Sequence, residues 1–75
     1  MTSWVKFVNR TNRKIIYISA DGYFLPHPLI REVPSQYTLI AAGSVNVDIY
    51  DSRFKQVSSH RISVPPRILC EIVLT

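Results

Sequence analysis

The sequence predicts an all-β protein, a small antiparallel β-sandwich of about seven short strands. Apolar residues alternate with period two through most of the 75 residues, as strands with one buried face require. No segment keeps apolar residues at helical spacing over about ten positions. Turn residues recur about every eight to twelve positions. A chain of this length holds one hydrophobic core, so residues 1–75 are predicted to form a single domain.

The first expected strand is Trp4–Asn9, with Val5 and Phe7 on one face. A polar turn follows, because Asn and Thr side chains bond readily to the nearby backbone. The second expected strand, Lys14–Ser19, is apolar on both faces, which favours a central place in a sheet.

The pair Asp21-Gly22 predicts a type I′ hairpin turn, because both residue types accept the positive φ that this turn needs. Residues Tyr23–Leu25 are expected to return as the partner strand. Pro26 and Pro28 lack the N–H that a β-ladder uses, so the next segment should be an edge or an irregular crossing.

The second half of the chain offers further strands. Tyr37–Ala41 and Val45–Tyr50 are expected to be joined by a turn at Gly43-Ser44, with the odd-numbered residues of the second strand facing the core. Two short strands are predicted next, at Phe54–Val57 and Arg61–Val64. The last strand, Arg67–Leu74, is apolar on both faces and is therefore expected to be central or covered.

Several classes of protein are disfavoured by the composition. Cys70 is the only cysteine, so no intramolecular disulfide can form, and it is expected to pack as a small hydrophobic residue. Two histidines and one cysteine give no spaced ligand set, so neither a metal nor a cofactor is expected. No apolar run is long enough for a signal core or a membrane span. These features predict an intracellular, soluble protein without a membrane partner.

The nearest approach to a catalytic motif is Ser58-Ser59-His60. Adjacent strand residues point to opposite faces, so Ser59 and His60 cannot form a nucleophile–base hydrogen bond in an extended segment. Ser58 and His60 could share a face, but no acidic residue lies nearby in the sequence to orient the histidine. The prediction is a protein that is not an enzyme and has no small-molecule substrate.

Hydrophobic residues make up 47% of the chain, more than so small a core can enclose. The sequence therefore predicts a non-enzymatic interaction module, an accessory or structural subunit of a larger assembly, with a protein partner or a homo-oligomer. The expected apolar contacts are Trp4, Tyr50, Leu69 and Val73, which are large side chains predicted to point outward. Tyr17 is instead expected to pack between the sheets.

The net charge of +4 permits a second hypothesis. Arg10, Arg13 and Lys14 should gather at one end of the sandwich with Lys6 one strand away, and Arg53 and Lys55 form a second pair in a later turn. Arginine matches the geometry of phosphate and carboxylate groups. The alternative function is therefore nucleic-acid binding, as a subunit of a ribonucleoprotein or nucleoprotein complex.

The stretch Phe7-Val8-Asn9-Arg10-Thr11, the apolar residues 15–18, the Asp21-Gly22 turn and the later Val33-Pro34 turn form a recognisable order. This order resembles the β domain of the von Hippel-Lindau tumour suppressor family over about residues 5–51, with a looser extension to Val64. The resemblance implies a β-sandwich and, as a third alternative, recognition of a peptide.

Departures from that family limit what the resemblance implies. The family binds a hydroxylated proline with a histidine, a tryptophan, a serine and a tyrosine, placed around the strands that correspond to residues 37–50. Here that stretch contains neither histidine nor tryptophan and offers only Ser44 and Tyr50. The family's helical part has no counterpart in residues 1–75. The expectation is the family's scaffold without its degron-binding function.

Overall fold

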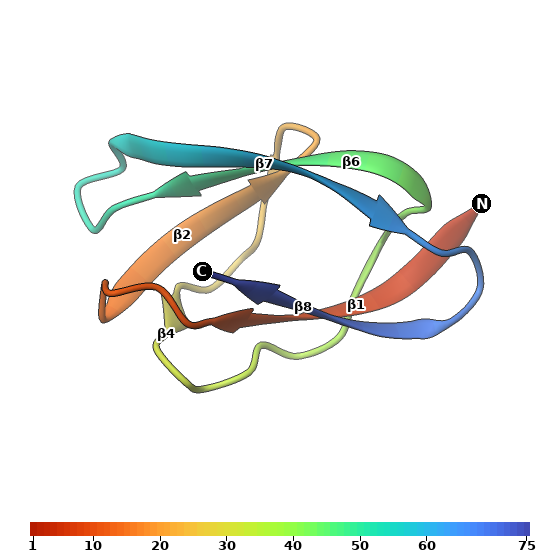
Figure 1. The fold of residues 1–75 in the computed structure, drawn as a ribbon, viewed down its shortest axis with the longest axis horizontal. Coiled ribbons are helices and arrows are strands. Elements are labelled where there is room, and N and C mark those ends of the chain that lie inside the picture. The colour runs from red at the N-terminus through yellow and green to blue at the C-terminus, as the bar shows by residue number, and fades with distance from the viewer.

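The structure is a computed structural model that describes all of residues 1–75, and it contains eight strands and no helix (Figure 1). In chain order the strands are β1 (Thr2–Asn9), β2 (Ile15–Ala20), β3 (Tyr23–Phe24), β4 (Leu29–Ile30), β5 (Thr38–Ala41), β6 (Gly43–Tyr50), β7 (Gln56–Val64) and β8 (Leu69–Leu74). The smaller sheet has the order β5-β1-β8, and the larger has the order β3-β2-β6-β7, with β4 paired to β2. The predicted all-β sandwich is confirmed.

In the smaller sheet β1 is the central strand. It pairs antiparallel with β5 and parallel with β8, so the sandwich is antiparallel except for this one pair. The parallel pair arises because the turn after β7 crosses to the smaller sheet beside the start of β1, where Arg67 N–H donates to the carbonyl of Thr2. From that point β8 can only run in the same direction as β1.

The prediction that the last strand is central or covered is wrong. β8 is an edge strand, and its outward residues, Leu69 and Val73, are exposed. Only the inward residues are shielded by the larger sheet, Leu74 fully and Ile72 in part. Apolar residues on both faces of β8 therefore do not show that both faces are buried, because only the inner face packs against the core of the domain.

The larger sheet follows the sequence more closely. β2 lies between β3 and β6, as its two apolar faces predicted. The Asp21-Gly22 turn is confirmed, with φ of +48° and +86° at its two residues. In contrast, the two short strands expected at Phe54–Val57 and Arg61–Val64 are one continuous strand, β7, whose residues from Ser58 onward pair in register with β6. The turn expected at Gly43-Ser44 is also wrong, because both residues belong to β6 and pair with β7. The polar residues 58–60 obscure the alternation without interrupting the backbone ladder.

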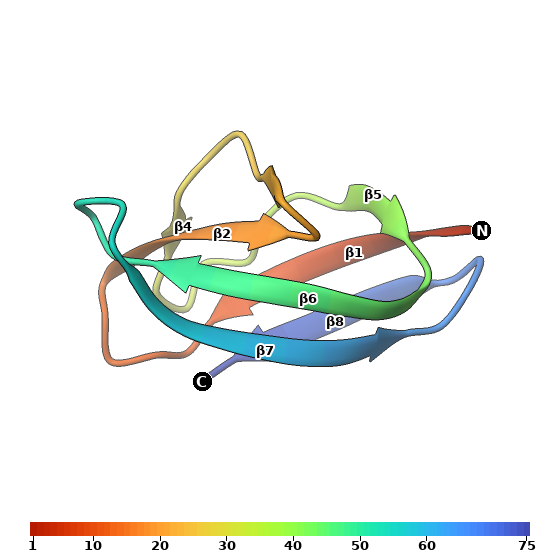
Figure 2. The ribbon, with the colours of Figure 1, turned by 90° about the horizontal axis from the view of Figure 1, so that it is seen from above.

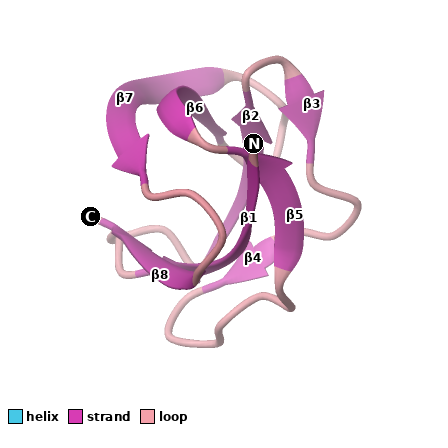
Figure 3. Ribbon diagram, turned by 90° about the vertical axis from the view of Figure 1, so that its right-hand side faces the viewer, coloured by secondary structure: helices cyan, strands magenta, loops and turns pink.

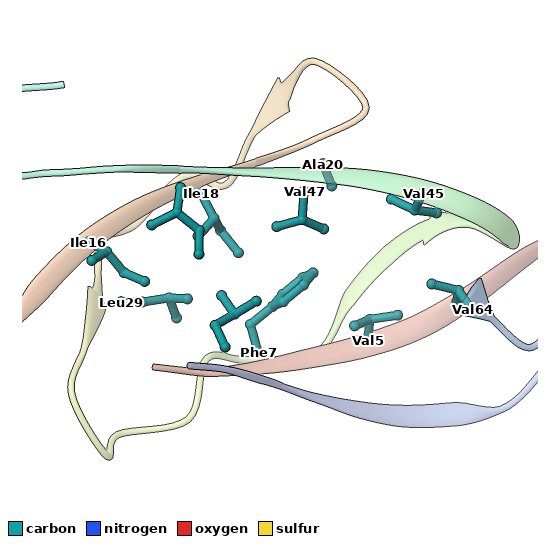
Figure 4. Packing of buried hydrophobic residues seen from close by; sticks show 11 residues of the cluster. Val5, Phe7, Ile16, Ile18, Ala20, Leu29, Val45, Val47 and Val64 are labelled. Atoms are coloured by element: carbon teal, nitrogen blue, oxygen red, sulfur yellow. The ribbon is translucent and has the colours of Figure 1, made fainter. Parts of the chain in front are cut away.

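The core lies between the two sheets (Figure 4). Val5 and Phe7 point inward from β1, as predicted, and meet the odd-numbered residues of β6. The complete buried cluster is Val5, Phe7, Ile16, Ile18, Ala20, Leu29, Val45, Val47, Ile49, Val64 and Leu74.

Seen from above, β6 and β7 lie over β1 and β8 (Figure 2). The end view places β7 and β8 on one side of the molecule and β3 and β5 on the other (Figure 3).

The side chain of Asn9 joins the two sheets at one end of the sandwich. Its Nδ2 donates to the carbonyls of Arg13 (3.1 Å) and Leu29 (3.2 Å), and its Oδ1 accepts from Thr11 N–H (3.0 Å) and Thr11 Oγ1 (2.6 Å). Asn9 is completely buried, so each of these groups depends on the others for its hydrogen bonds. The polar stretch between β1 and β2 is therefore, at Asn9 and Thr11, part of the structural frame.

Substituting Asn9→Asp should destabilise the fold by at least about 3 kcal/mol, because a carboxylate cannot donate to the two carbonyls and adds a buried charge. Urea unfolding of the purified chain measures this. The control Asn12→Asp makes the same chemical change at an exposed position of the same loop and should stay within about 0.5 kcal/mol of the wild type. If Asn9→Asp and Asn12→Asp lowered the free energy of unfolding by the same amount, Asn9 would not be holding the fold together through its buried hydrogen bonds.

Candidate interaction surfaces

Two of the predicted apolar residues meet on the outer face of the smaller sheet. Trp4 on β1 is in register with Leu39 on β5 and with Leu69 on β8, so the three side chains form a row across all three strands. They are 48%, 50% and 65% exposed, respectively. We call Leu39, Trp4 and Leu69 the outer apolar row. Sequence reasoning missed Leu39, because Leu39 and Ile40 are adjacent apolar residues and the sequence pattern does not tell which of them points outward.

A hollow of about 300 Å³ opens at this row, and Ile68 contributes to its lining together with Trp4, Leu39 and Leu69. The turn before β8 is held there by a hydrogen bond from Ser3 Oγ to the carbonyl of Pro65. Val73 lies on the same face, beyond Glu71. The structure thus brings Trp4, Leu69 and Val73 onto one side of the molecule.

Lys6 borders the outer apolar row. The prediction that it joins the other cations at one end of the sandwich is therefore wrong. Its ammonium lies 4.8 Å from the centre of the Tyr37 ring, a cation–π contact, and it faces Glu71 across the β1–β8 pair. The strand period explains the position, because Lys6 shares its face with Trp4. A polar border therefore lies beside the apolar side chains.

Tyr50 lies on the opposite side of the molecule, on the outer face of the larger sheet. There it belongs to an aromatic cluster of four rings: Tyr17, Phe24, Tyr50 and Phe54. Tyr17 stacks on Phe54 with centroids 4.3 Å apart, and Phe24 lies 5.0 Å from Tyr50 and edge-on to Phe54 at 6.4 Å. The expectation that Tyr17 packs between the sheets is wrong, because its neighbours Ile16 and Ile18 occupy the inward positions.

Phe54 reaches the cluster from the turn between β6 and β7. The turn closes on Asp51, whose Oδ1 accepts from the N–H groups of Arg53 (2.8 Å) and Lys55 (3.0 Å). Phe54 adopts φ of +62°, in the left-handed region that a bulky residue rarely enters, while its N–H donates to the carbonyl of Asp51. The predicted strand Phe54–Val57 is wrong at its start, because β7 begins only at Gln56 and Phe54 lies in the turn, so its place in the aromatic cluster was not predicted.

The hydrogen bonds from the backbone of Lys55 and then of Arg53 lower the pKa of Asp51 below its ordinary value of 3.8, and the charge of Arg13 acts in the same direction. The lowered pKa means that the ionised carboxylate is the form that the turn stabilises. Arg13 and Lys14 line a hollow of about 420 Å³ with Asp51 and Ser52. Arg13 and Lys14 therefore lie beside the turn that carries Arg53 and Lys55.

Arg10 is an exception among the predicted cations. Its Nε lies 3.3 Å from Glu32 Oε1, the one ion pair in the structure. Both side chains are more than half exposed, so the pair adds little stability but engages the Arg10 charge. The unpaired cations at this end are Arg13, Lys14, Arg53 and Lys55.

Two adjoining hollows, of about 340 and 390 Å³, run along the seam between β3 and β5. They share Leu25, Pro26, Thr38 and Leu39, and the second also includes Trp4 and His27. Their lining is mostly apolar, and Ser35 Oγ, which lines the second hollow with His27, donates to the carbonyl of Gln36 (2.9 Å). Through Trp4 and Leu39, the second hollow continues into the outer apolar row.

The Ser58-Ser59-His60 motif is divided between the two faces of β7, as its spacing predicted. Ser59 Oγ donates to Asp48 Oδ1 (2.8 Å) on the outer face, while His60 is in register with the core residue Val47. Cys70 packs half-buried against the core. No three histidine, cysteine, aspartate or glutamate side chains lie close enough to hold a metal ion, and no helix could span a membrane.

The fold and these surfaces define a small all-β sandwich that exposes an apolar row on one sheet and an aromatic cluster with adjacent cations on the other. Comparison with known proteins gives no match, whether with protein-family models, curated proteins or solved structures. The resemblance to the von Hippel-Lindau β domain therefore stays a prediction.

The turn at Asp51 should make stability depend on acid pH. A carboxylate whose folded pKa is lowered contributes its full stability above the ordinary value of 3.8 and loses it as the pH falls through the folded pKa. We expect the wild-type unfolding temperature to fall more steeply than that of Asp51→Asn between about pH 5 and pH 2. Glu71→Gln, outside the turn, is the matched control and should keep the wild-type slope. Parallel curves for wild type and Asp51→Asn would contradict this role.

Proposed function

We propose that this chain is a non-enzymatic protein-interaction module, an accessory or structural subunit that docks on a partner protein through the outer apolar row. The observation that carries the proposal is the alignment of Leu39, Trp4 and Leu69 across three paired strands. Single exposed apolar residues are normal on a protein surface, whereas a contiguous apolar set with a polar border is typical of an interface.

The balance between buried and exposed apolar residues supports this proposal. Twelve hydrophobic residues are buried, while fourteen large ones are exposed, so the core leaves more large apolar side chains outside than it encloses within. Water contact with those side chains is unfavourable at roughly 25 cal/mol per Å². A partner that covers these side chains removes them from water, and the free energy released by their burial then stabilises the complex.

The outer apolar row alone is too small to hold a partner. Burying the exposed half of three large side chains yields on the order of 1 kcal/mol each, less than the 4–15 kcal/mol that association is estimated to cost. A stable contact needs about 800 Å² on each partner. The footprint must therefore extend over Ile68, in the turn before β8, and over Val73 on β8, both of which are exposed beside the row.

The free edge of β8 offers a second means of attachment. β8 pairs only with β1, so the N–H and C=O groups on its other side have no strand partner within the domain. An extended segment of the partner could pair with this edge and add main-chain hydrogen bonds to the side-chain burial. The edge and the outer apolar row adjoin at Leu69, so one partner can engage both.

Site-specific photocrosslinking tests the proposal in the cells that make the protein. A benzoylphenylalanine at Leu69 should give one discrete protein adduct, while the same residue at exposed Ser63, on the outer face of the larger sheet, should give none. Trp4→Ser should reduce the Leu69 adduct by about tenfold, because truncating an interface tryptophan removes about 1.4 kcal/mol or more of binding energy.

Light scattering on the purified chain identifies the partner class: a dimer that Trp4→Ser dissociates makes the partner a second copy, and a monomer makes it a different protein. Adduct patterns that are the same at Leu69 and Ser63, or that Trp4→Ser leaves intact, would contradict docking through the outer apolar row.

A further inference from the structure

We infer that the outer face of the larger sheet is a binding site for single-stranded nucleic acid, in which bases stack on Phe54 and Phe24 and phosphates contact the neighbouring cations. This surface belongs to the larger sheet, whereas the outer apolar row lies on the smaller one. The inference is therefore independent of the proposed function.

The aromatic cluster presents ring surface that the fold does not cover. Phe54 and Phe24 are 58% and 52% exposed although both contact other rings. Tyr17 covers one face of Phe54 at stacking distance, and Phe24 approaches edge-on, so exposed ring area remains on the solvent side. Bases stack on such rings without regard to sequence, because every base has a π face.

The cluster lies over a buried residue of β2, and its rings contact one another. Ser19 lies on the same face of β2 as Tyr17, in register with Phe24, and is almost completely buried. The backbone of Phe54 is held by the closed turn at Asp51, and its ring stacks on Tyr17 on this side of the sheet. A ring that is already fixed loses little entropy when a base stacks on it.

The charges around the cluster complement a phosphate backbone. Arg53 and Lys55 flank Phe54 in the chain, and Arg13 and Lys14 line the hollow beside the same turn. None of these four forms an ion pair. They are free to bind anions, and the combination of unpaired cations with aromatic rings is the composition that single-stranded nucleic-acid sites use.

The two carboxylates on this surface are already engaged in the sheet. Asp51 accepts from the backbone of its own turn, and Asp48 accepts from Ser59 Oγ (2.8 Å) and Asn46 Nδ2 (3.3 Å). Four cations against two engaged carboxylates leave a net positive surface. An acidic peptide would satisfy the charges but would leave the rings without a stacking partner, so the rings favour nucleic acid.

Fluorescence anisotropy with a labelled oligouridylate of about twelve nucleotides tests the inference, because this strand has no duplex and a single-stranded site spans about 4–16 nucleotides. Phe54→Asn removes the ring but keeps a residue type that accepts positive φ, so the turn should persist. We expect about tenfold or greater weakening of oligouridylate binding. The control Tyr37→Asn removes an exposed ring beside a cation on the smaller sheet and should bind as the wild type does.

The salt dependence of binding isolates the cations. Changing Arg53 and Lys55 together to Gln should reduce the slope of log affinity against log salt by about 1.4, because each phosphate contact contributes about 0.7 for a single strand. Lys6→Gln with Arg67→Gln makes the same change of net charge on the smaller sheet and should leave the slope unchanged. Circular dichroism confirms that each variant is folded.

Three results would overturn the inference: no binding at about 50 mM salt, wild-type affinity in Phe54→Asn, or oligoglutamate binding that is as tight as oligouridylate binding. The last result would assign the surface to an acidic protein. None of these outcomes affects the photocrosslinking result at Leu69, so failure of this inference is distinguishable from failure of the proposed function.

Discussion

The buried amide of Asn9 is the interaction on which the arrangement of this molecule depends. It bonds the end of β1 to the loop before β2 and to β4, and so fixes the separation of the two sheets at that end. Its four hydrogen bonds also fix the path of residues 10–14, because Thr11 and Arg13 are both partners. The position of the Arg13 and Lys14 cations thus follows from a polar contact inside the protein.

A second constraint is the small volume between the sheets. One strand from each sheet, β1 and β6, supplies five of the eleven residues of the buried cluster, and little room remains for other large side chains. The large apolar side chains that do not fit between the sheets lie on the two outer faces, because successive residues of a strand point to opposite sides. On the smaller sheet it forms the outer apolar row, and on the larger sheet it forms the aromatic cluster. Two chemically different surfaces on one small domain are the consequence.

Much of this architecture could be predicted from the sequence, and the failures have physical causes. Period-two alternation placed Val5, Phe7 and the β6 residues correctly, because each of those strands has one buried face. Alternation cannot tell which sheet an outward residue joins, so Trp4 and Tyr50 were grouped although they lie on opposite sheets. It also assigned Phe54 to the strand Phe54–Val57, whereas Phe54 lies in the turn before β7, and so its place in the aromatic cluster was missed. Apolar residues on both faces predicted a central β2 correctly and a central β8 wrongly.

The parallel pairing of β1 with β8 has a consequence for how the chain folds. Trp4 and Leu69 face each other across almost the whole length of the sequence. Closing so large a loop carries a high entropic cost before any contact repays it, so this pairing should come late in folding. During synthesis on the ribosome, β1 has to wait for β8 before its sheet is complete. Until then its open side can pair with other strands, which makes nascent chains the species most exposed to aggregation.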